Sequence, residues 1–412
     1  MSEFGIRSIT FSIDLDKIVK KGYQDTVAEK VKAVKSGISS EEIFVRTVRF
    51  NILPIKPDER LDKFLFLKKI QTLAEFSESI GIRWFNIAFN LIGVSNKETK
   101  VITSLAYDIV KKYKNSFINF IVADHEEINP FAALQCSQMI LNASTLSSNG
   151  FDNFRVGVSL NPAENTPFFP FSYAKKDLSF SLACEITEPF IDILKNNPND
   201  DINELRPKFE SSLKSFGSML DALAKKSAAE QEVNYGGMDV SLAPFPDDKV
   251  SVIQILHLLG LDDIGSNGTL FLTSYLTGIL KSIFKGTDIT PAGFNGVMYS
   301  LLEDHTMCES NNKKQLDIDK IIGYSTLCGC GLDMVPIPGN IIVEELASTI
   351  LDVAVTSIKL KKPLGVRVLP IPGKDVNEMT TFDMDFLTNT RVMKMKNMSL
   401  NHKFFELNKY SV

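Results

Sequence analysis

Short apolar segments alternate with helix-length amphipathic segments along most of this 412-residue chain. The first segments predict strands at 6–13, 43–53, 84–91 and 117–122, with helices between them at 16–34, 61–80 and 97–112. Strands that alternate with helices favour parallel pairing through right-handed crossover helices. This alternation is the feature that most limits how the chain can fold.

The same rhythm resumes in the second half of the chain. Further strands are predicted at 154–160, 180–183, 240–243, 296–302, 332–335 and 364–369, and further helices at 202–231, 250–259, 268–284 and 341–359. About ten strands spread over the whole length favour an α/β fold in which residues 1–412 form a single domain, either one large barrel with its helices outside or one large sheet. The polar loop at 196–201 is a candidate internal boundary, and a surface loop within one domain explains it as well.

Composition excludes some partners and compartments. Lys and Arg number 45 and Asp and Glu number 50, so the net charge of −5 does not favour broad binding to nucleic acid or to an anionic membrane. The apolar stretch at 269–280 is too short to span a bilayer, and charged residues interrupt the N-terminal segment. Five cysteines without a disulfide or zinc spacing indicate a reducing compartment. We therefore expect a cytoplasmic protein without a metal site.

Two polar segments of the second half are candidates for a site. Asp239 and Ser241 flank Val240, so on a strand the carboxylate and the hydroxyl point to one face, although a turn cap explains Asp239 equally well. A second segment precedes an apolar helix and offers backbone N–H groups to an anion, although an ordinary N-cap also explains it: Gly265, Ser266, Asn267, Gly268 and Thr269.

An ionisable cluster follows in the chain at Glu303, Asp304 and His305. A histidine beside a carboxylate has a fixed tautomer and a raised basicity, which suits acid–base catalysis. His305 and Cys308 do not predict zinc, because no second Cys/His pair lies near them. A solvated loop is the alternative interpretation.

Cys328 lies in a Cys-Gly-Cys-Gly segment whose glycines allow the backbone to approach a ligand closely. Its thiol is a candidate nucleophile or proton relay, and a buried structural cysteine is the alternative. Asp333 starts the next predicted strand, and Arg367 and Lys374 are the cations that match these acids. The common signatures of hydrolases, zincins and dinucleotide-binding proteins do not occur in the sequence.

Together these segments closely resemble the domain-of-unknown-function family 711, often labelled "PFL family protein", from about residue 6 to about residue 393. The resemblance is carried, in chain order, by Ile6-Arg-Ser-Ile-Thr10, Asn129-Pro-Phe131, Asp239-Val-Ser-Leu-Ala-Pro244, Asp263-Ile-Gly-Ser-Asn-Gly-Thr269, Gly293-Phe-Asn-Gly296, Glu303-Asp304, Cys328-Gly-Cys-Gly-Leu-Asp-Met-Val-Pro-Ile-Pro-Gly339 and Arg367-Val-Leu-Pro-Ile-Pro-Gly-Lys374.

The resemblance implies a barrel of the pyruvate formate-lyase-like type, with about ten strands and a loop threaded inside. In glycyl-radical enzymes of that fold the inner loop carries a catalytic cysteine, a part that Cys328 would play here. The glycyl-radical motif Arg-Val-x-Gly-aromatic is absent from the C-terminal region, so the sequence does not predict glycyl-radical activity.

The resulting hypothesis is a cytosolic enzyme that acts on a small anionic metabolite at one end of a barrel. Cys328, Asp333, Asp239, Asp304 and His305 are its predicted catalytic residues. The predicted ligand-binding residues are Ser241, Gly265, Ser266, Asn267, Gly268, Thr269, Glu303, Arg367 and Lys374. The alternative is a non-catalytic metabolite-binding or structural protein, in which the Phe- and Pro-rich segment at 167–171 would form a subunit contact. In either case we expect a homo-oligomer, while the cofactor, the substrate and the reaction stay open.

Overall fold

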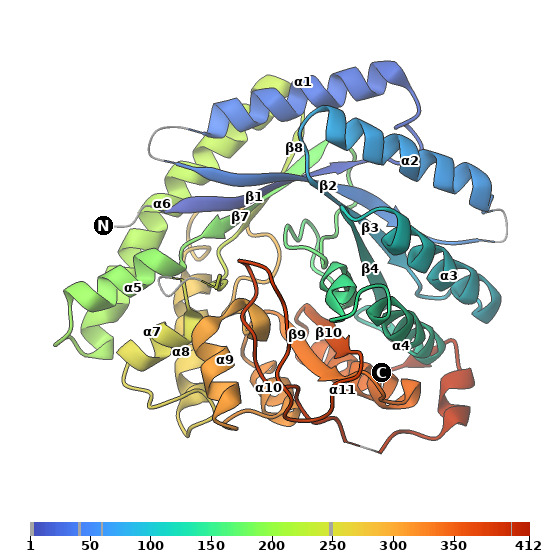
Figure 1. The fold of residues 1–412 in the computed structure, drawn as a ribbon. Helices are drawn as coiled ribbons and strands as arrows, with labels where there is room; N and C mark the ends of the chain where they lie inside the picture. Colours follow the sequence, from blue (N-terminus) through green and yellow to red (C-terminus); the bar gives the residue numbers. More distant parts are fainter. Residues whose placement is uncertain (1–3, 40–42, 59–60, 247–249, 397) are drawn as a thin grey trace.

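The computed structural model describes residues 4–39, 43–58, 61–246, 250–396 and 398–412 (Figure 1). Its strands are β1 (Gly5–Ile13), β2 (Val45–Ile55), β3 (Trp84–Asn90), β4 (Ser116–Ala123), β5 (Glu127–Ile128), β6 (Val156–Leu160), β7 (Ser179–Glu185), β8 (Asn234–Asp239), β9 (Gly331–Pro338), β10 (Leu364–Ile371) and β11 (Tyr410–Ser411).

The α-helices are α1 (Lys21–Ile38), α2 (Lys63–Ser79), α3 (Asn96–Lys112), α4 (Pro130–Ser144), α5 (Thr187–Asn196), α6 (Ile202–Gln231), α7 (Val252–Leu258), α8 (Thr269–Ser282), α9 (His305–Asn312), α10 (Ile318–Tyr324) and α11 (Val343–Lys359). Three 3₁₀-helices complete the described structure: η1 (Phe151–Arg155), η2 (Leu301–Glu303) and η3 (His402–Glu406). No helix in these described ranges has both the length and the apolar character needed to cross a membrane.

The strands form one 11-stranded sheet in the order β8-β7-β1-β2-β3-β4-β6-β10-β9, with β5 and β11 attached beside β4. Strands β1 to β4 and β6 are parallel, which confirms the parallel pairing predicted for the first four strands. The sheet then reverses direction twice, because β7 is antiparallel to β1 and β10 is antiparallel to β6. The sheet therefore consists of a central parallel block, β1-β2-β3-β4-β6, flanked by two parallel pairs, β7-β8 and β9-β10, that run in the opposite direction.

The two edge strands, β8 and β9, do not pair with each other, so no continuous ladder closes the sheet into a barrel. An irregular segment, residues 291–300, lies between these edges. Isolated bridges join it to the β8 side at Met238–Pro291 and Leu242–Val297, and to β9 at Ser300–Asp333. Regular strands at 240–243 and 296–302, which the sequence predicts, are absent: β8 ends at Asp239 and residues 301–303 form η2. The mixed α/β class is confirmed, and the sheet is open.

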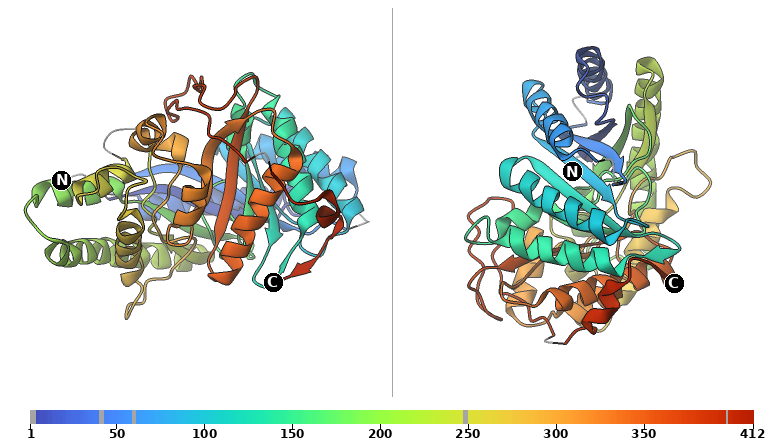
Figure 2. Two further views of the ribbon diagram at one scale, coloured as in Figure 1. Left: turned by 90° about the horizontal axis from the view of Figure 1, so that it is seen from below. Right: turned by 90° about the vertical axis from the view of Figure 1, so that its right-hand side faces the viewer.

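Helices cover the outer face of the sheet, and a loop occupies its inner face (Figures 1 and 2). The loop at 161–178 connects β6 to β7 and lies on the concave side in Figure 1. Asn86 and Asn119 donate side-chain hydrogen bonds to the carbonyl of Ser172, at 3.1 and 3.2 Å, and Thr10 donates to the carbonyl of Pro167 at 2.8 Å. Polar side chains on the inner face of β1, β3 and β4 therefore hold this inner loop.

Glycines on β6 and β10 make room for the inner loop. A Cβ at Gly365 would lie 2.4 Å from Cε1 of Phe171, and one at Gly157 would lie 2.5 Å from Cγ of Pro170. Both distances are far shorter than an ordinary carbon–carbon contact of about 3.5–4.0 Å. The loop can therefore pack directly on the backbone of these strands only because the two residues are glycines.

Replacing Gly365 with alanine is expected to lower the free energy of unfolding by about 1–3 kcal/mol, because the new methyl group displaces the ring of Phe171. Gly278→Ala is the matched control. Gly278 lies inside α8 with no atom within 4 Å of an added Cβ, so alanine there should be neutral or stabilising by up to about 1 kcal/mol. Urea unfolding followed by circular dichroism measures both changes. Equal stability of Gly365→Ala and the wild type would contradict this packing.

Candidate functional site

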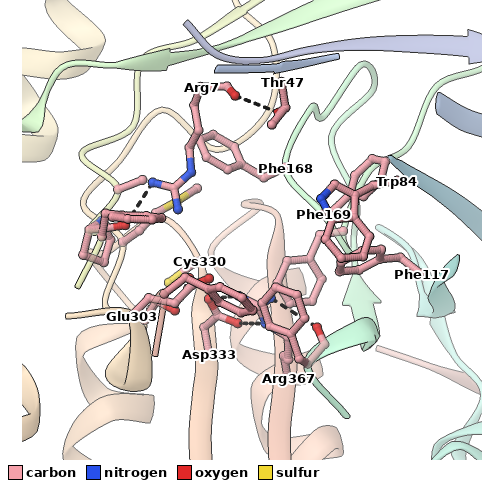
Figure 3. Close-up of a pocket in the computed structure, with 18 of the residues that line it drawn as sticks. Arg7, Thr47, Trp84, Phe117, Phe168, Phe169, Glu303, Cys330, Asp333 and Arg367 are labelled. Atoms are coloured by element: carbon pink, nitrogen blue, oxygen red, sulfur yellow. Dashed lines mark hydrogen bonds and ion pairs between the residues drawn. The ribbon is translucent and has the colours of Figure 1, made fainter. Parts of the chain in front are cut away.

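A cavity of about 280 Å³ lies on the inner side of the sheet, between the inner loop and the segment at 291–300. Residues from eight strands or their flanking segments line it, and many are arginine or aromatic (Figure 3). The lining residues are Arg7, Arg46, Thr47, Arg49, Arg83, Trp84, Phe117, Phe154, Phe168, Phe169, Phe171, Ala243, Pro244, Phe245, Phe294, Met298, Ser300, Glu303, Cys330, Asp333, Arg367 and Phe386. Such a concave, mainly apolar wall with a few charged groups is typical of a small-molecule site.

A buried ion network forms one wall of the cavity. Asp333 on β9 and Arg367 on β10 face each other across paired positions of these parallel strands. Arg367 donates from Nε to Oδ1 of Asp333 at 2.6 Å and from Nη2 to Oδ2 at 2.9 Å, a bidentate pair. Its Nη2 also lies 3.4 Å from Oε2 of Glu303, which accepts from Ser300. Burial opposes the charge of Arg367, but the two carboxylates outweigh burial and raise its pKa.

Two cysteines precede β9, and only the second lines the cavity. Gly329 between them lies against Gly296, since a Cβ at Gly296 would be 2.9 Å from Cα of Gly329. The N–H of Gly329 also donates to the carbonyl of Val297. This close contact of two backbones holds Cys330 at the cavity wall, whereas Cys328 does not line the cavity, and both thiols are buried and unbridged.

The two thiols influence each other, so their protonation is linked. The neighbouring Cys330 thiol favours a Cys328 thiolate and, against the opposing effect of burial, lowers the pKa of Cys328 to about 6, while Cys330 Sγ lies 3.9 Å from the carbonyl oxygen of Gly331. The positive charge of Lys362 and the backbone N–H groups of Gly331 and Cys330 act in the same direction. The neighbouring Cys328, together with burial, raises the pKa of Cys330 well above its ordinary value. Cys328 is therefore the thiol of the pair that loses its proton first.

Arginines on β1 and β2 form the wall opposite this network, and Figure 3 shows Arg7 pointing across the cavity toward Cys330 and Glu303. The sequence analysis did not select Arg7, Arg46 or Arg49. The sequence feature that could have identified them is a charged residue inside an otherwise apolar strand segment. Their convergence depends on the register of β1 on β2, which pairs Ile6 with Val45 and Thr10 with Arg49.

Asp239 and Ser241 are outside the cavity lining. The buried Asp239 carboxylate accepts hydrogen bonds from Ser241 N at 2.9 Å, Ser241 Oγ at 2.6 Å, Phe294 N at 2.7 Å and Asn295 N at 3.1 Å. Burial raises its pKa to about 6, although these donors favour the charged form. In this position Asp239 joins the end of β8 to the segment at 291–300.

Asp304 and His305 are also outside the cavity lining. The carboxylate of Asp304 caps α9 by accepting from Met307 N at 3.1 Å, and it also accepts from Ser251 Oγ at 2.7 Å and Val252 N at 2.9 Å. Burial raises the pKa of Asp304. His305 is half-buried at the start of α9, with its Nε2 3.3 Å from Oε1 of Glu309. The structure thus separates these two residues from the thiols.

The remaining predicted ligand-binding residues lie elsewhere too. Lys374 follows β10 and lies 3.9 Å from Glu378. The segment Gly265, Ser266, Asn267, Gly268 and Thr269 leads into α8, whose N-cap Gly268 has no capping side chain, and none of its residues lines the cavity. Of the residues selected from the sequence, the cavity brings together Glu303, Asp333 and Arg367, and it does not include Cys328.

Comparisons with known proteins give a family and no activity. The model of a family described as "Uncharacterised ACR (DUF711)" matches residues 1–389. A "UPF0210 protein" of Ligilactobacillus salivarius is 26% identical over 92% of this chain and 88% of its own length. "UPF0210 protein" relatives from Pyrobaculum islandicum and Acetivibrio thermocellus are each 25% identical, over 90% and 96% of this chain and 86% and 91% of their own lengths.

Proposed function

Because the chain belongs to the uncharacterised DUF711 family, we propose a function from its cavity: an enzyme that acts on a small anionic metabolite with a cysteine thiol. The observation that carries the proposal is the linked thiol pair at the wall of an arginine- and aromatic-lined cavity. In this proposal Cys330 is the nucleophile and Cys328 is the group that accepts its proton. Thiolates are the reactive form of cysteine, and in the linked pair Cys328 supplies the base that converts Cys330 to one.

The proposed step is the addition of a thiol to a carbonyl carbon of the bound ligand. A lone pair of the Cys330 sulfur forms the new S–C bond, and the carbonyl π electron pair moves to the oxygen. The Cys330 proton passes to the neighbouring Cys328 thiolate, and the cationic wall stabilises the oxyanion. Arg367 stays paired with Asp333 throughout, so it keeps the shape of the wall and transfers no proton.

Alkylation by iodoacetamide tests the thiol pair without knowledge of the substrate. We expect iodoacetamide to modify Cys330. The rate should rise with pH around a midpoint near 6, because the pair loses its first proton there. An ordinary thiol would instead give a midpoint of about 8.5. Replacing Cys328 with serine should move the midpoint above about 8.5, because it removes the proton acceptor. Peptide mapping by mass spectrometry at several pH values measures site and rate.

Cys308→Ser is the matched control for this experiment. Cys308 is another buried cysteine, but it donates to the carbonyl of Leu301 outside the cavity lining, so its replacement should leave the profile unchanged. Alkylation confined to cysteines other than 328 and 330, or a wild-type midpoint above pH 8, would overturn the proposed role of the pair.

Non-catalytic metabolite binding is a second proposal, favoured by the complete pairing of Arg367 with its two carboxylates. Exposed apolar side chains on α2 and α8, namely Phe64, Leu65, Leu270 and Phe271, support a homo-oligomer in either case. Phe168, Phe169 and Phe171, by contrast, are buried inside the molecule and line the cavity instead of offering a subunit contact.

We also propose that the fold is a barrel of the pyruvate formate-lyase-like type. In this barrel residues 291–300 occupy the gap between β8 and β9, where a regular strand would close the sheet. The three isolated bridges from that segment to β8 and β9 support this proposal. The inner position of the loop at 161–178 supports it as well. A cytoplasmic location is a proposal that rests on composition and on the five unbridged cysteines.

A further inference from the structure

Two arginines in the cavity lack the partner that a buried cation normally has. Arg7 on β1 and Arg49 on β2 are half-buried, and among the described residues neither forms an ion pair with a carboxylate. Arg7 donates from Nη1 to the carbonyl of Pro244 at 2.9 Å, and Arg49 donates from Nε to Oγ1 of Thr47 at 3.0 Å. Each guanidinium has five N–H donors in a planar fork, so both keep donors for another partner.

Other arginines of this protein show the contrast. Arg155 is fully buried and pairs with Asp152, and Arg367 pairs with Asp333. Burying a charge is unfavourable unless the charge is paired or hydrogen-bonded. Burial, and then the nearby charge of Arg7, lowers the pKa of Arg49 to about 9, which leaves the guanidinium charged at neutral pH. An anion placed between Arg7 and Arg49 would neutralise this repulsion.

Flat rings extend from this cationic wall into the cavity. Arg49 lies over the ring of Phe169, 5.3 Å from its centroid, and Arg7 lies 5.9 Å from the centroid of Phe245. Further rings from Trp84, Phe117 and five other phenylalanines complete the wall. Aromatic side chains pack favourably against other flat rings, both face to face with an offset and edge to face. The volume of about 280 Å³ is at the small end for ligand sites, which excludes a large ligand.

We propose that Arg7 and Arg49 form an anion subsite, and that the ligand of the cavity is a small aromatic molecule carrying a carboxylate or a phosphate. The anionic group binds the donors of the two arginines. The ring lies among the phenylalanines and extends toward Cys330, which Figure 3 shows on the opposite side from Arg7. This inference rests on the proposed function only in using the same cavity, because it requires no chemistry at the thiols.

Calorimetric titration of the full chain with simple probes tests the inference. Benzoate and phenyl phosphate represent the two kinds of anion on a ring, acetate and inorganic phosphate represent the anions alone, and benzyl alcohol represents the ring alone. We expect at least one of the two aryl anions to bind at least tenfold more tightly than its matching anion and than benzyl alcohol, because only the aryl anions satisfy both walls. Whichever aryl anion binds more tightly identifies the anionic group.

Variants then locate the subsite. Arg49→Gln and Arg7→Gln are each expected to weaken binding of the preferred aryl anion by at least tenfold and to leave binding of benzyl alcohol unchanged. Arg206→Gln is the matched control, because Arg206 is an exposed arginine on α6 that pairs with Glu210, far along the chain from the cavity residues. Circular dichroism establishes that each variant is folded before titration.

Several results would overturn the inference. Equal affinity for benzyl alcohol and the aryl anions would show that no anion subsite exists. Equal affinity for an aryl anion and for its matching anion, inorganic phosphate or acetate, would show that the ligand need not be aromatic. Unchanged affinity of both folded arginine variants for the preferred aryl anion would show that Arg7 and Arg49 do not form the subsite. The alkylation profile of the wild type, measured without any aryl anion, reports on the thiol proposal separately, so either proposal can fail while the other stands.

Discussion

Replacing Arg367 with methionine is expected to lower the free energy of unfolding by about 3–5 kcal/mol, the usual effect of breaking a buried ion pair from one side. The substitution removes the bidentate partner of Asp333 and the neighbour of Glu303, and it leaves both carboxylates in a mainly apolar wall. The methionine fills most of the space, so the loss is electrostatic rather than a packing defect. Urea unfolding at pH 7, followed by circular dichroism, measures the change.

Two further variants make the result specific. Arg206→Met removes an exposed arginine from its pair with Glu210 and should change the stability by less than about 1 kcal/mol. Arg367→Met combined with Asp333→Leu should recover much of the lost stability, because it replaces the pair with apolar groups instead of leaving a lone carboxylate. If Arg367→Met lost no more stability than Arg206→Met, the ion network would have no structural role.

Replacing Asp239 with alanine is the second prediction with a large expected effect. Its carboxylate accepts four hydrogen bonds, from Ser241, Phe294 and Asn295, and each donor left unsatisfied in the interior is unfavourable by about 1–3 kcal/mol. We expect a loss of about 3–5 kcal/mol near pH 4–5, since some donors can find new partners. The cavity should be lost with it, because Phe294 and its segment line one wall.

The pH dependence of this loss follows from the raised pKa of Asp239. Burial raises the pKa to about 6 in the folded protein, above the ordinary value of about 3.9 in the unfolded chain. This raised pKa contributes up to about 3 kcal/mol to the free energy of unfolding. The contribution is fully present below about pH 4 and is lost as the pH rises through 6. The difference between the wild type and Asp239→Ala should therefore shrink between pH 4 and pH 7.

Asp201→Ala is the control for Asp239→Ala. Asp201 also accepts backbone hydrogen bonds, from Asn203 and Glu204, but it does so at the exposed start of α6, where water can replace it. Its replacement should lower the stability by about 1 kcal/mol. An equal effect of the two alanine variants, at every pH, would contradict the buried role of Asp239.

The sequence predicted the regular part of the fold because that part is encoded locally. Strand β1 alternates apolar with polar residues, β4 is a mainly apolar run of the right length, and turns or prolines mark where several strands end. The segment beyond β8 was predicted as strand and is irregular. There the carboxylate of Asp239 accepts hydrogen bonds from backbone N–H groups that would otherwise pair strand with strand. A single aspartate in a sequence does not indicate such a role.

The residues of the candidate site were likewise predicted only in part. Asp333 and Arg367 were selected individually, and the register of β9 on β10 then places them opposite each other. The sequence favoured Cys328, but Cys330 is the cysteine that lines the cavity, because the contact between Gly329 and Gly296 sets the path of the loop. Arg7 and Arg49 were not selected, since their meeting depends on two strands separated by a helix.

The pairing of early and late strands in one sheet has a consequence for synthesis of the chain on the ribosome. Arg7 lies near the start of the chain, whereas Arg367 and Phe386 lie near its end, yet all three line one cavity. At about 5–20 residues per second, Arg7 is made about 20–70 s before Arg367. Nascent and prematurely terminated chains therefore contain the cationic wall without its opposite side. The proposed ligand site is therefore complete only after synthesis has passed Phe386.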